Sequence, residues 1–403
     1  MDVYVARQPI FDKNKKVHGY ELLFRDGLSN AFPDIDGNTA TSKVLHHSFL
    51  TIGLDNITGS GSAFVNFTQD LLLRRVPLLF PSHRMVVEVL EDVEPVDGVI
   101  QACREIRQGG YALALDDFFY SAGMEPLIAL ADIVKMDFRA TPPDEMGAFV
   151  EPLSGRSVNL LAEKVETHEE FARALDMGFR YFQGYFFSKP EVLQGRDISN
   201  AHMGLLEIMA EANKEGFEID HLEKLIARDV TVSYKLMRYI NSAYFKRVNE
   251  ISSIRQAIVL LGEKQIRRFL SLIAMANLAE GKPNELIRTS IIRAKFCEAL
   301  GEMNHQSVNP SELFTLGLFS CIDAIMDGSM EDLMEKLPLS RGIKEALVKG
   351  AGSLSGYLAI VLDYEKGRWK QLADSVEQLG LSEEEIPDRY VETLAWAEQF
   401  MHL

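Results

Sequence analysis

The chain has 403 residues, 47% of them hydrophobic and 25% charged, which excludes a single small domain and is typical of soluble globular proteins rather than of disordered chains. Its 42 Lys and Arg residues against 59 Asp and Glu residues give a net charge of −17, which opposes binding to nucleic acids and to anionic membranes. A site for a phosphorylated ligand stays open, because metal ions or nearby arginines can reverse the potential locally.

Targeting and cysteine content point to the cytoplasm. No apolar run reaches 18 residues, and the N-terminus lacks the basic and apolar regions of a signal peptide. Cys103, Cys297 and Cys321 are too few and too scattered for a disulfide framework or a CxxC metal site. We expect a cytoplasmic protein with buried thiols and no membrane contact.

From the start to about residue 190, short β-rich runs alternate with helical stretches. This alternation predicts a mainly parallel sheet, and eight strands can close into an α/β barrel of the TIM type. Because the length is small for that fold, some helices must be short or missing, and one of the two opening strands is free to run antiparallel. We expect strands at residues 3–10, 17–24, 63–67, 85–90, 112–115, 133–136, 159–162 and 181–182, and helices at residues 39–50, 69–75, 96–109, 125–131 and 168–177.

After residue 190 the pattern becomes almost entirely helical. The change divides the chain into a barrel at residues 1–195 and an all-helical domain at residues 196–403. Helices are expected at residues 202–211, 221–227, 231–242, 254–261, 263–276, 283–300, 311–326, 330–336, 341–348 and 354–364, with a few more to the end.

Polar residues interrupt or end seven of the N-terminal strands. A carboxylate buried alone in such a run costs several kcal/mol, so these groups must share protons, pair with a lysine or bind cations. In a β/α barrel the C-terminal ends of the strands converge on one face, which would bring the carboxylates of this set, together with Asn66 and Gln183, into one cup. The residues are Glu21, Asn66, Glu88, Asp116, Asp117, Lys135, Glu163 and Gln183.

The chemistry of this set favours metal binding. An oxygen-only donor set without Cys or His suits Mg²⁺ or Mn²⁺ rather than zinc. So many carboxylates suggest two ions, the arrangement that activates water and stabilises the leaving oxygen in phosphoester hydrolysis. For any single residue of the set, a solvated strand end is the alternative.

Residues 1–190 resemble the EAL domain of cyclic di-GMP phosphodiesterases. The run from Arg7 to Ile10 is similar to the opening Gln-Pro-Ile strand of that family, and the run from Glu21 to Arg25 resembles its Glu-Ala-Leu-x-Arg signature. The resemblance implies metal-assisted attack of water on one phosphodiester of cyclic di-GMP, giving linear pGpG. It implies metal ligands at Glu21, Asn66, Glu88, Asp116, Asp117 and Glu163, catalytic roles for Lys135, Glu163 and Glu166, and ligand contacts at Gln8, Arg25 and Gln183.

The chain departs from this family in its supporting residues. The loop at residues 119–123 differs from a Gly-Thr-Gly-Tyr-Ser-Ser type and is shorter, and in the family that loop supports metal geometry and a dimer contact, so homodimerisation stays open. Lys164 stands where the family has glycine, and either reaches into the cup, where it would repel a metal, or points into solvent. Leu90 and Glu91 replace a Thr-Glu pair.

The helical half resembles the HDOD module, a relative of HD-type phosphohydrolases. The resemblance lies in Asn241-Ser242-Ala243-Tyr244-Phe245 and in the run from Ala257 to Gly262. An HD hydrolase needs a His-Asp pair for its metal, and Ser320-Cys321 stands at that position. We therefore expect this half to be a protein-binding or scaffolding module without enzyme activity.

Two functions follow from these resemblances. The first is a signalling protein whose EAL-like barrel binds and hydrolyses cyclic di-GMP with divalent metal, while the HDOD module binds partner proteins. The second is an adaptor or receptor whose barrel has lost turnover. The complete metal set favours the first, whereas Lys164 and the altered loop favour the second.

Overall fold

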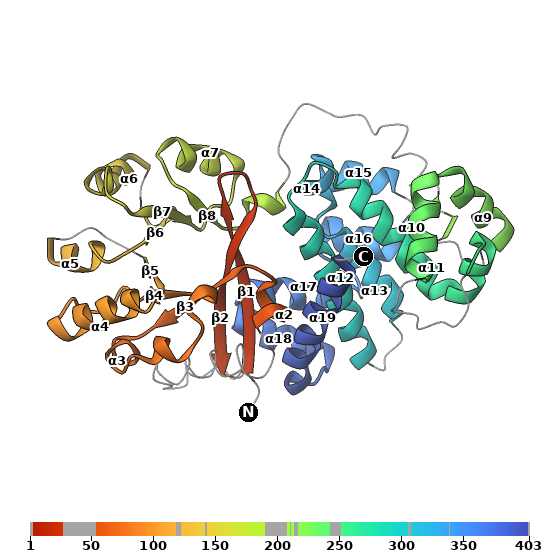
Figure 1. Ribbon diagram of the computed structural model, residues 1–403. Coiled ribbons are helices and arrows are strands. Elements are labelled where there is room, and N and C mark those ends of the chain that lie inside the picture. Colours follow the sequence, from red (N-terminus) through yellow and green to blue (C-terminus); the bar gives the residue numbers. More distant parts are fainter. Residues whose placement is uncertain are drawn as a thin grey trace. The chain divides into compact units, whose positions relative to one another are not determined.

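Eight strands close into a barrel in which every strand pairs with its neighbours in chain order (Figure 1). The expected α/β barrel is confirmed, with all eight strands at the predicted places. β1 runs antiparallel to both β2 and β8, and the other neighbours pair in parallel. The strands are β1 (Val3–Asp12), β2 (Val17–Asp26), β3 (Ser62–Phe67), β4 (Met85–Val89), β5 (Ala112–Leu115), β6 (Ile133–Asp137), β7 (Asn159–Glu163) and β8 (Tyr181–Gln183).

This computed structural model describes ten stretches of the chain, which group into two compact units. The first unit comprises Met1–Lys189, Leu362–Asp374 and Glu383–Ala395, and the second comprises Pro190–Val361, Ser375–Ser382 and Trp396–Leu403. The division into domains at residue 195 stays a prediction. The described residues are 3–26, 54–117, 122–141, 143–189, 208–209, 211–212, 217–241, 251–304, 308–337 and 339–401.

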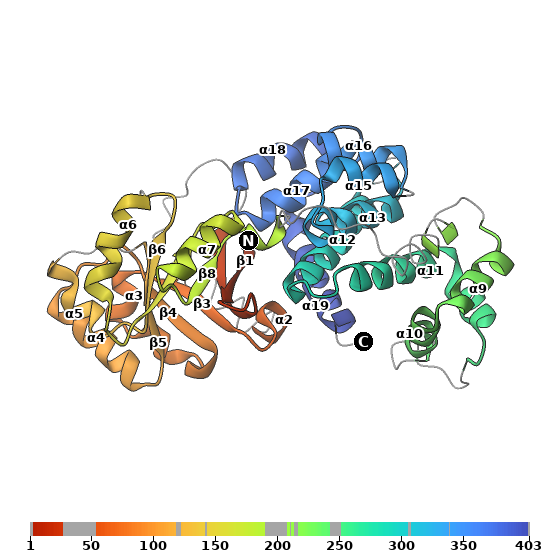
Figure 2. The same cartoon turned by 90° about the horizontal axis from the view of Figure 1, so that it is seen from above.

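Helices on the outside of the strands connect the parallel part of the barrel (Figures 1 and 2). α4 buries Val99, Cys103 and Ile106, which share one face at helical spacing. α3 and α5 have only five and four residues, so the expected short helices are confirmed. α2 and α6 were not expected, and the helix predicted at residues 39–50 lies outside the described residues. The helices are α2 (Leu54–Thr58), α3 (Gln69–Leu73), α4 (Asp97–Gln108), α5 (Glu125–Ile128), α6 (Pro143–Val150) and α7 (His168–Asp176).

One layer of apolar side chains fills the barrel interior. Side chains alternate between the two faces of a strand, so each strand sends every second residue inward. Because this layer occupies the floor of the barrel, the next inward residue of each strand lies in the cup above it. The layer consists of Ile10, Phe64, Val86, Ala114, Ile133, Leu161 and Tyr181.

Helices α9 to α16 belong to the second unit, and the helices that follow contribute segments to both units. The predicted break after residue 261 is confirmed, since Gly262 interrupts the helical path of α11 with φ 70° and ψ 170°. The described helices are α9 (Ile219–Arg228), α10 (Val230–Ile240), α11 (Ile254–Leu278), α12 (Asn284–Met303), α13 (Pro310–Phe319), α14 (Ile322–Met326), α15 (Met330–Lys336), α16 (Arg341–Lys349), α17 (Ser355–Glu365), α18 (Trp369–Leu379) and α19 (Ile386–Met401).

The single helix predicted at residues 311–326 is wrong, because the structure divides it into α13 and α14. The Ser320 hydroxyl donates a hydrogen bond of 2.7 Å to the Gly317 carbonyl, and Cys321 has the non-helical angles φ −118° and ψ 16°. A serine that bonds its own preceding turn competes with the helical hydrogen bonds. Among the described helices, none has the length and apolar character required to cross a membrane.

Candidate active site

On every strand except β2, a polar residue lies two positions from a residue of the apolar floor. Asn66 follows Phe64, Glu88 follows Val86, and the same spacing holds on β5 to β8. On β1, which runs in the opposite direction, the polar residue precedes the floor residue, as Gln8 precedes Ile10. The period of two therefore places the predicted residues in one inward layer at the C-terminal ends of the parallel strands.

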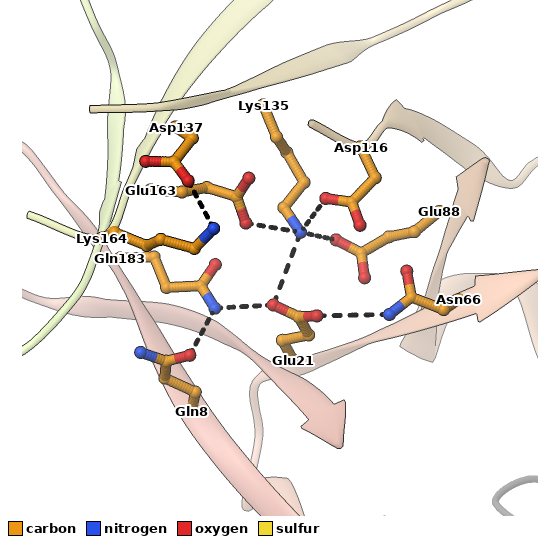
Figure 3. A network of polar contacts seen from close by, with 10 residues as sticks. All are labelled: Gln8, Glu21, Asn66, Glu88, Asp116, Lys135, Asp137, Glu163, Lys164 and Gln183. Carbon is orange, nitrogen blue, oxygen red and sulfur yellow. Dashed lines mark hydrogen bonds and ion pairs between the residues drawn. The ribbon is translucent and has the colours of Figure 1, made fainter. Parts of the chain in front are cut away.

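The centre of this layer is the ammonium of Lys135, which four carboxylates surround (Figure 3). Its Nζ atom lies 2.7 Å from Asp116 Oδ1, 2.8 Å from Glu88 Oε1, 2.9 Å from Glu163 Oε1 and 3.4 Å from Glu21 Oε2. The Lys135 and Glu88 side chains have no exposed surface. The structure thus brings together predicted residues from five different strands or strand ends.

Amide side chains fix the orientation of Glu21. Gln183 Nε2 donates to Glu21 Oε2 at 2.6 Å and to Gln8 Oε1 at 2.9 Å. Asn66 Nδ2 donates to the other Glu21 oxygen, Oε1, at 3.3 Å. The amides that bond Glu21 directly thus come from β8 and β3, while Gln8, which lies opposite Glu21 in the register of β1 and β2, accepts a hydrogen bond from Gln183.

Negative charge exceeds positive charge in this buried cluster. Burial raises the pKa of Glu88 well above its usual range, and the charges of Glu21 and Asp116 add to the shift although Lys135 opposes it. Burial also raises the pKa of Asp116, and it raises the pKa of Glu163 to about 8. One ammonium therefore does not balance four carboxylates, and the cluster holds protons at neutral pH.

Two groups of the cluster shift in the direction that favours their charge. Burial acts to raise the pKa of Glu21, but Lys135 and the hydrogen bonds from Gln183 and Asn66 outweigh it, and the pKa falls. Burial acts to lower the pKa of Lys135, but the surrounding carboxylates, Glu163 first among them, raise it well above its usual value. Lys135 is consequently a permanent cation.

The donor set suits a hard divalent cation. Glu88 Oε2 and Asp117 Oδ1 are buried and have no hydrogen-bond partner among the described residues, as expected for oxygens that can accept a metal. In the arrangement shown, however, no three Asp, Glu, His or Cys side chains of the described residues converge closely enough to hold an ion. The carboxylates converge on Lys135 instead.

Lys164 has a partner that the sequence reasoning missed. Its ammonium contacts Asp137 Oδ2, while Asp137 Oδ1 accepts the backbone N–H groups of Arg139 at 2.7 Å and Ala140 at 3.0 Å. Asp137 lies two residues after Lys135 on β6, so the same period of two that gives the cup could have identified it. Lys164 is therefore neither free in solvent nor within ion-pair distance of Glu163.

Other predicted residues lie apart from the cluster. Glu166 is not among the carboxylates that contact Lys135; it lies 2.5 Å from Arg139 and 3.6 Å from Lys189. Arg25 is on β2, but its side chain is outside what the structure describes. Residues 118–121 are also outside it, which leaves most of the altered loop undescribed.

The position of the missing His-Asp pair is occupied by structural contacts. The Arg293 guanidinium lies 3.1 Å from Cys321 Sγ and 3.3 Å from Ser320 Oγ. Both Arg293 and Cys321 are buried. Within the described part of the helical unit, these residues form no metal-binding group.

Fold and site define a class: an α/β barrel with a carboxylate cup at its strand ends, followed in the chain by helices. Sequence comparison finds the EAL domain family at residues 45–190 and the HDOD domain family at residues 201–341. The chain belongs to the family of proteins that combine an EAL domain with an HDOD domain.

Two relatives match over more than nine-tenths of their length. "Cyclic di-GMP phosphodiesterase CdgJ" of Vibrio cholerae is 38% identical over 403 residues, which cover 99% of this chain and 93% of that protein. YuxH of Bacillus subtilis is 35% identical over 411 residues, covering 100% of this chain and 99% of that protein. A solved structure, the Bacillus subtilis YkuI protein with cyclic di-GMP and calcium, is 22% identical, covers 65% of this chain and 73% of that chain, and gives a TM-score of 0.38.

Proposed function

We propose that the barrel binds cyclic di-GMP with a divalent metal ion, Mg²⁺ or Mn²⁺, and hydrolyses it to pGpG. The observation that carries the proposal is the buried cup in which Glu21, Glu88, Asp116 and Glu163 surround Lys135. The relative CdgJ, of which the match covers 93%, supports it by the activity in its name.

The residues that would hold the metal are the oxygen donors of the cup. Those donors are Glu21, Asn66, Glu88, Asp116, Asp117 and Glu163. A divalent ion there would supply Lewis acidity toward a phosphoryl oxygen and toward the attacking water. Metal binding must compete with Lys135 for the same carboxylates, so we expect an affinity that rises with pH as the protonated carboxyls ionise.

The remaining roles belong to side chains of the chain itself. Gln183 donates to Glu21 and to Gln8. Gln8 and Gln183 are proposed to contact the nucleotide, and Arg25 is proposed to contact a phosphate. The Lys135 ammonium, with three N–H donors, is suited to orient water among the carboxylates. Glu163, whose pKa burial raises to about 8 in the metal-free protein, is proposed as a catalytic carboxylate, with Glu166 as its support.

The test is direct. Purified full-length protein is incubated with cyclic di-GMP and Mn²⁺, while nucleotide binding is followed by calorimetry and pGpG by chromatography. Glu21→Gln should weaken Mn²⁺ binding by at least about 10- to 100-fold, the loss common even for residues that only support a metal ligand. It should abolish pGpG formation with the fold intact, because it removes a cup carboxylate. Glu125→Gln, which alters a surface carboxylate paired with Arg156, is the control and should change neither. Equal Mn²⁺ titrations for Glu21→Gln and the parent would refute the site.

Nucleotide binding without turnover is the second candidate. It is favoured by the position of the Lys135 ammonium, which occupies the place where the carboxylates converge. Binding of cyclic di-GMP without any pGpG would select this receptor function. The HDOD region is proposed to bind partner proteins, and homodimerisation and the cytoplasmic location stay predictions.

A further inference from the structure

Lys164 is held in an unusual backbone conformation directly after Glu163. Its φ of 54° lies in the left-handed region, which costs a residue with a Cβ about 1–2 kcal/mol. The conformation turns the chain at the end of β7. It allows a long side chain to reach the end of the neighbouring strand β6.

Asp137 anchors this side chain at the mouth of the cup. The Asp137 carboxylate is almost fully buried and is itself fixed by two backbone N–H groups, so its second oxygen is fixed where the ammonium binds (Figure 3). In register, Asp137 lies opposite Glu163 across β6 and β7. The ammonium is therefore held at Asp137, next to the strand end that carries Glu163, although about half of the Lys164 side chain is exposed.

The charges around Lys164 are those of the outer cup. Burial acts to lower the pKa of the Lys164 ammonium, but the hydrogen bond to Asp137 and the charges of Asp117, Asp137 and Glu163 outweigh it, and the pKa rises. Asp117 Oδ1 is buried without a hydrogen-bond partner among the described residues. Without Lys164, Asp137 would lose the ammonium that it contacts, and Lys135, which pairs with Glu163, would be the remaining cation of the cluster on this side of the cup.

We propose that the Lys164 ammonium, anchored on Asp137, takes the place of a second divalent ion, so that the barrel binds one exchangeable metal ion per chain. The inference rests on the proposed metal-binding function. Its physical basis is that a fixed positive charge neutralises Asp137 and repels a dication from the adjacent Asp117 and Glu163. Asp137 acts as a positioning residue for that charge.

Metal stoichiometry tests the proposal without reference to turnover. Mn²⁺ binding to the full chain is measured by equilibrium dialysis, and the electron paramagnetic resonance spectrum reports whether two bound ions are magnetically coupled. The parent protein should bind one ion. Lys164→Met, which removes the charge at similar length, and Lys164→Gly, which suits the left-handed backbone, should both bind two ions and show coupling. Lys164→Arg keeps the charge and should stay at one.

The outcomes separate this inference from the proposed function. Two ions in the parent protein, or one ion in both neutral variants, would overturn the role of Lys164 and leave the metal-dependent function standing. Absence of Mn²⁺ binding in the parent and in every variant would overturn the metal site and the inference together. Circular dichroism of each variant verifies that its fold is intact.

Discussion

Lys135 carries a full positive charge at a position without solvent access, and its ion pairs are the reason that the charge is tolerated there. Removing one partner from a buried ionic cluster commonly costs about 3–5 kcal/mol, because the charges left behind stay buried. In this cluster four carboxylates would be left. Lys135 should therefore be required for the stability of the barrel as well as for its proposed activity.

We expect Lys135→Met to lower the free energy of unfolding by about 3–5 kcal/mol at pH 8. The loss should be smaller at pH 5.5. At that pH the buried carboxyls can be neutralised by protonation at a lower free-energy cost, because the pH is closer to the pKa that a carboxyl has in the unfolded chain. Urea unfolding at the two pH values measures the difference. An equal loss of stability at both pH values would contradict the prediction, because it would show that the effect of methionine comes from packing and not from unbalanced charge.

Glu163 gives a second dependence on pH, with a defined sign. Its pKa is about 8 in the fold against 4.5 for a free glutamate, so between these values the folded state holds a proton that the unfolded state has released. Stability from this group falls as pH rises through that window. Glu163→Gln should therefore gain stability relative to the parent between pH 5 and pH 8, on the order of a few kcal/mol. Urea unfolding of both proteins in metal-free buffer checks it, and a difference that is constant with pH would contradict the assignment.

At the residue scale, polar side chains at strand ends were enough to predict the cup. A carboxylate in a buried strand is costly unless it has a partner, so several of them together indicate a shared site. The central place of Lys135 was only one of three options, since spacing along the chain does not tell whether protons, a lysine or metals balance the charge. Asp137 was missed although it follows the same period. Its pairing with Lys164 depends on the left-handed backbone of that residue, which the glycine of the resembling family at this position could have indicated.

Among the elements, α12 and α13 pack with their backbones unusually close. A Cβ on Gly317 of α13 would lie 2.3 Å from the carbonyl oxygen of Arg293 on α12, and a Cβ on Gly301 would lie 2.4 Å from a methyl group of Leu313. Such approaches are open only to glycine. At Gly317 the facing atoms belong to the backbone of Arg293, which cannot move aside as a flexible side chain can. This contact therefore fixes the spacing of the two helices.

Gly317→Ala should lower the free energy of unfolding by about 1–3 kcal/mol, because the added methyl forces the two helices apart. Gly147→Ala is the matched control: Gly147 also lies in a helix, α6, but a Cβ there meets nothing within 4 Å. The control should leave stability unchanged or raise it by up to about 1 kcal/mol, since alanine is the better helix former. Thermal unfolding of both variants measures the two changes in stability. Equal changes would argue against a close backbone contact at Gly317.

Element types were predicted well because strand and helix periods differ and the barrel alternates them regularly. Short connectors such as α2 lack enough residues to show a period, and α6 begins at Pro143 after a turn-forming run. The break between α13 and α14 was missed because Ser320 and Cys321 continue an apolar helical pattern. The hydrogen bond from the Ser320 hydroxyl to the preceding turn competes with the helical bonds there, and the pattern of apolar residues does not indicate it.

For the whole molecule, the chemistry is expected to be confined to the barrel. A fragment of residues 196–403 should show no Mn²⁺-dependent cleavage of cyclic di-GMP, since Ser320 and Cys321 replace the metal-binding pair. Because the first unit includes Leu362–Asp374 and Glu383–Ala395, this fragment also loses packing partners and should unfold at a lower temperature than the intact chain. Product formation by the fragment, measured beside the full chain at equal concentration, would contradict the prediction.

The direction of β1 has a practical consequence for work on the protein. Val3 pairs with Asp26, the last residue of β2, and β2 runs in parallel with the strands whose ends form the cup. Any segment joined ahead of Val3 therefore leaves the barrel at the end that carries the cup. An affinity tag or fluorescent fusion placed there would lie close to the mouth of the cup. Assays of ligand binding should therefore keep added segments away from Val3.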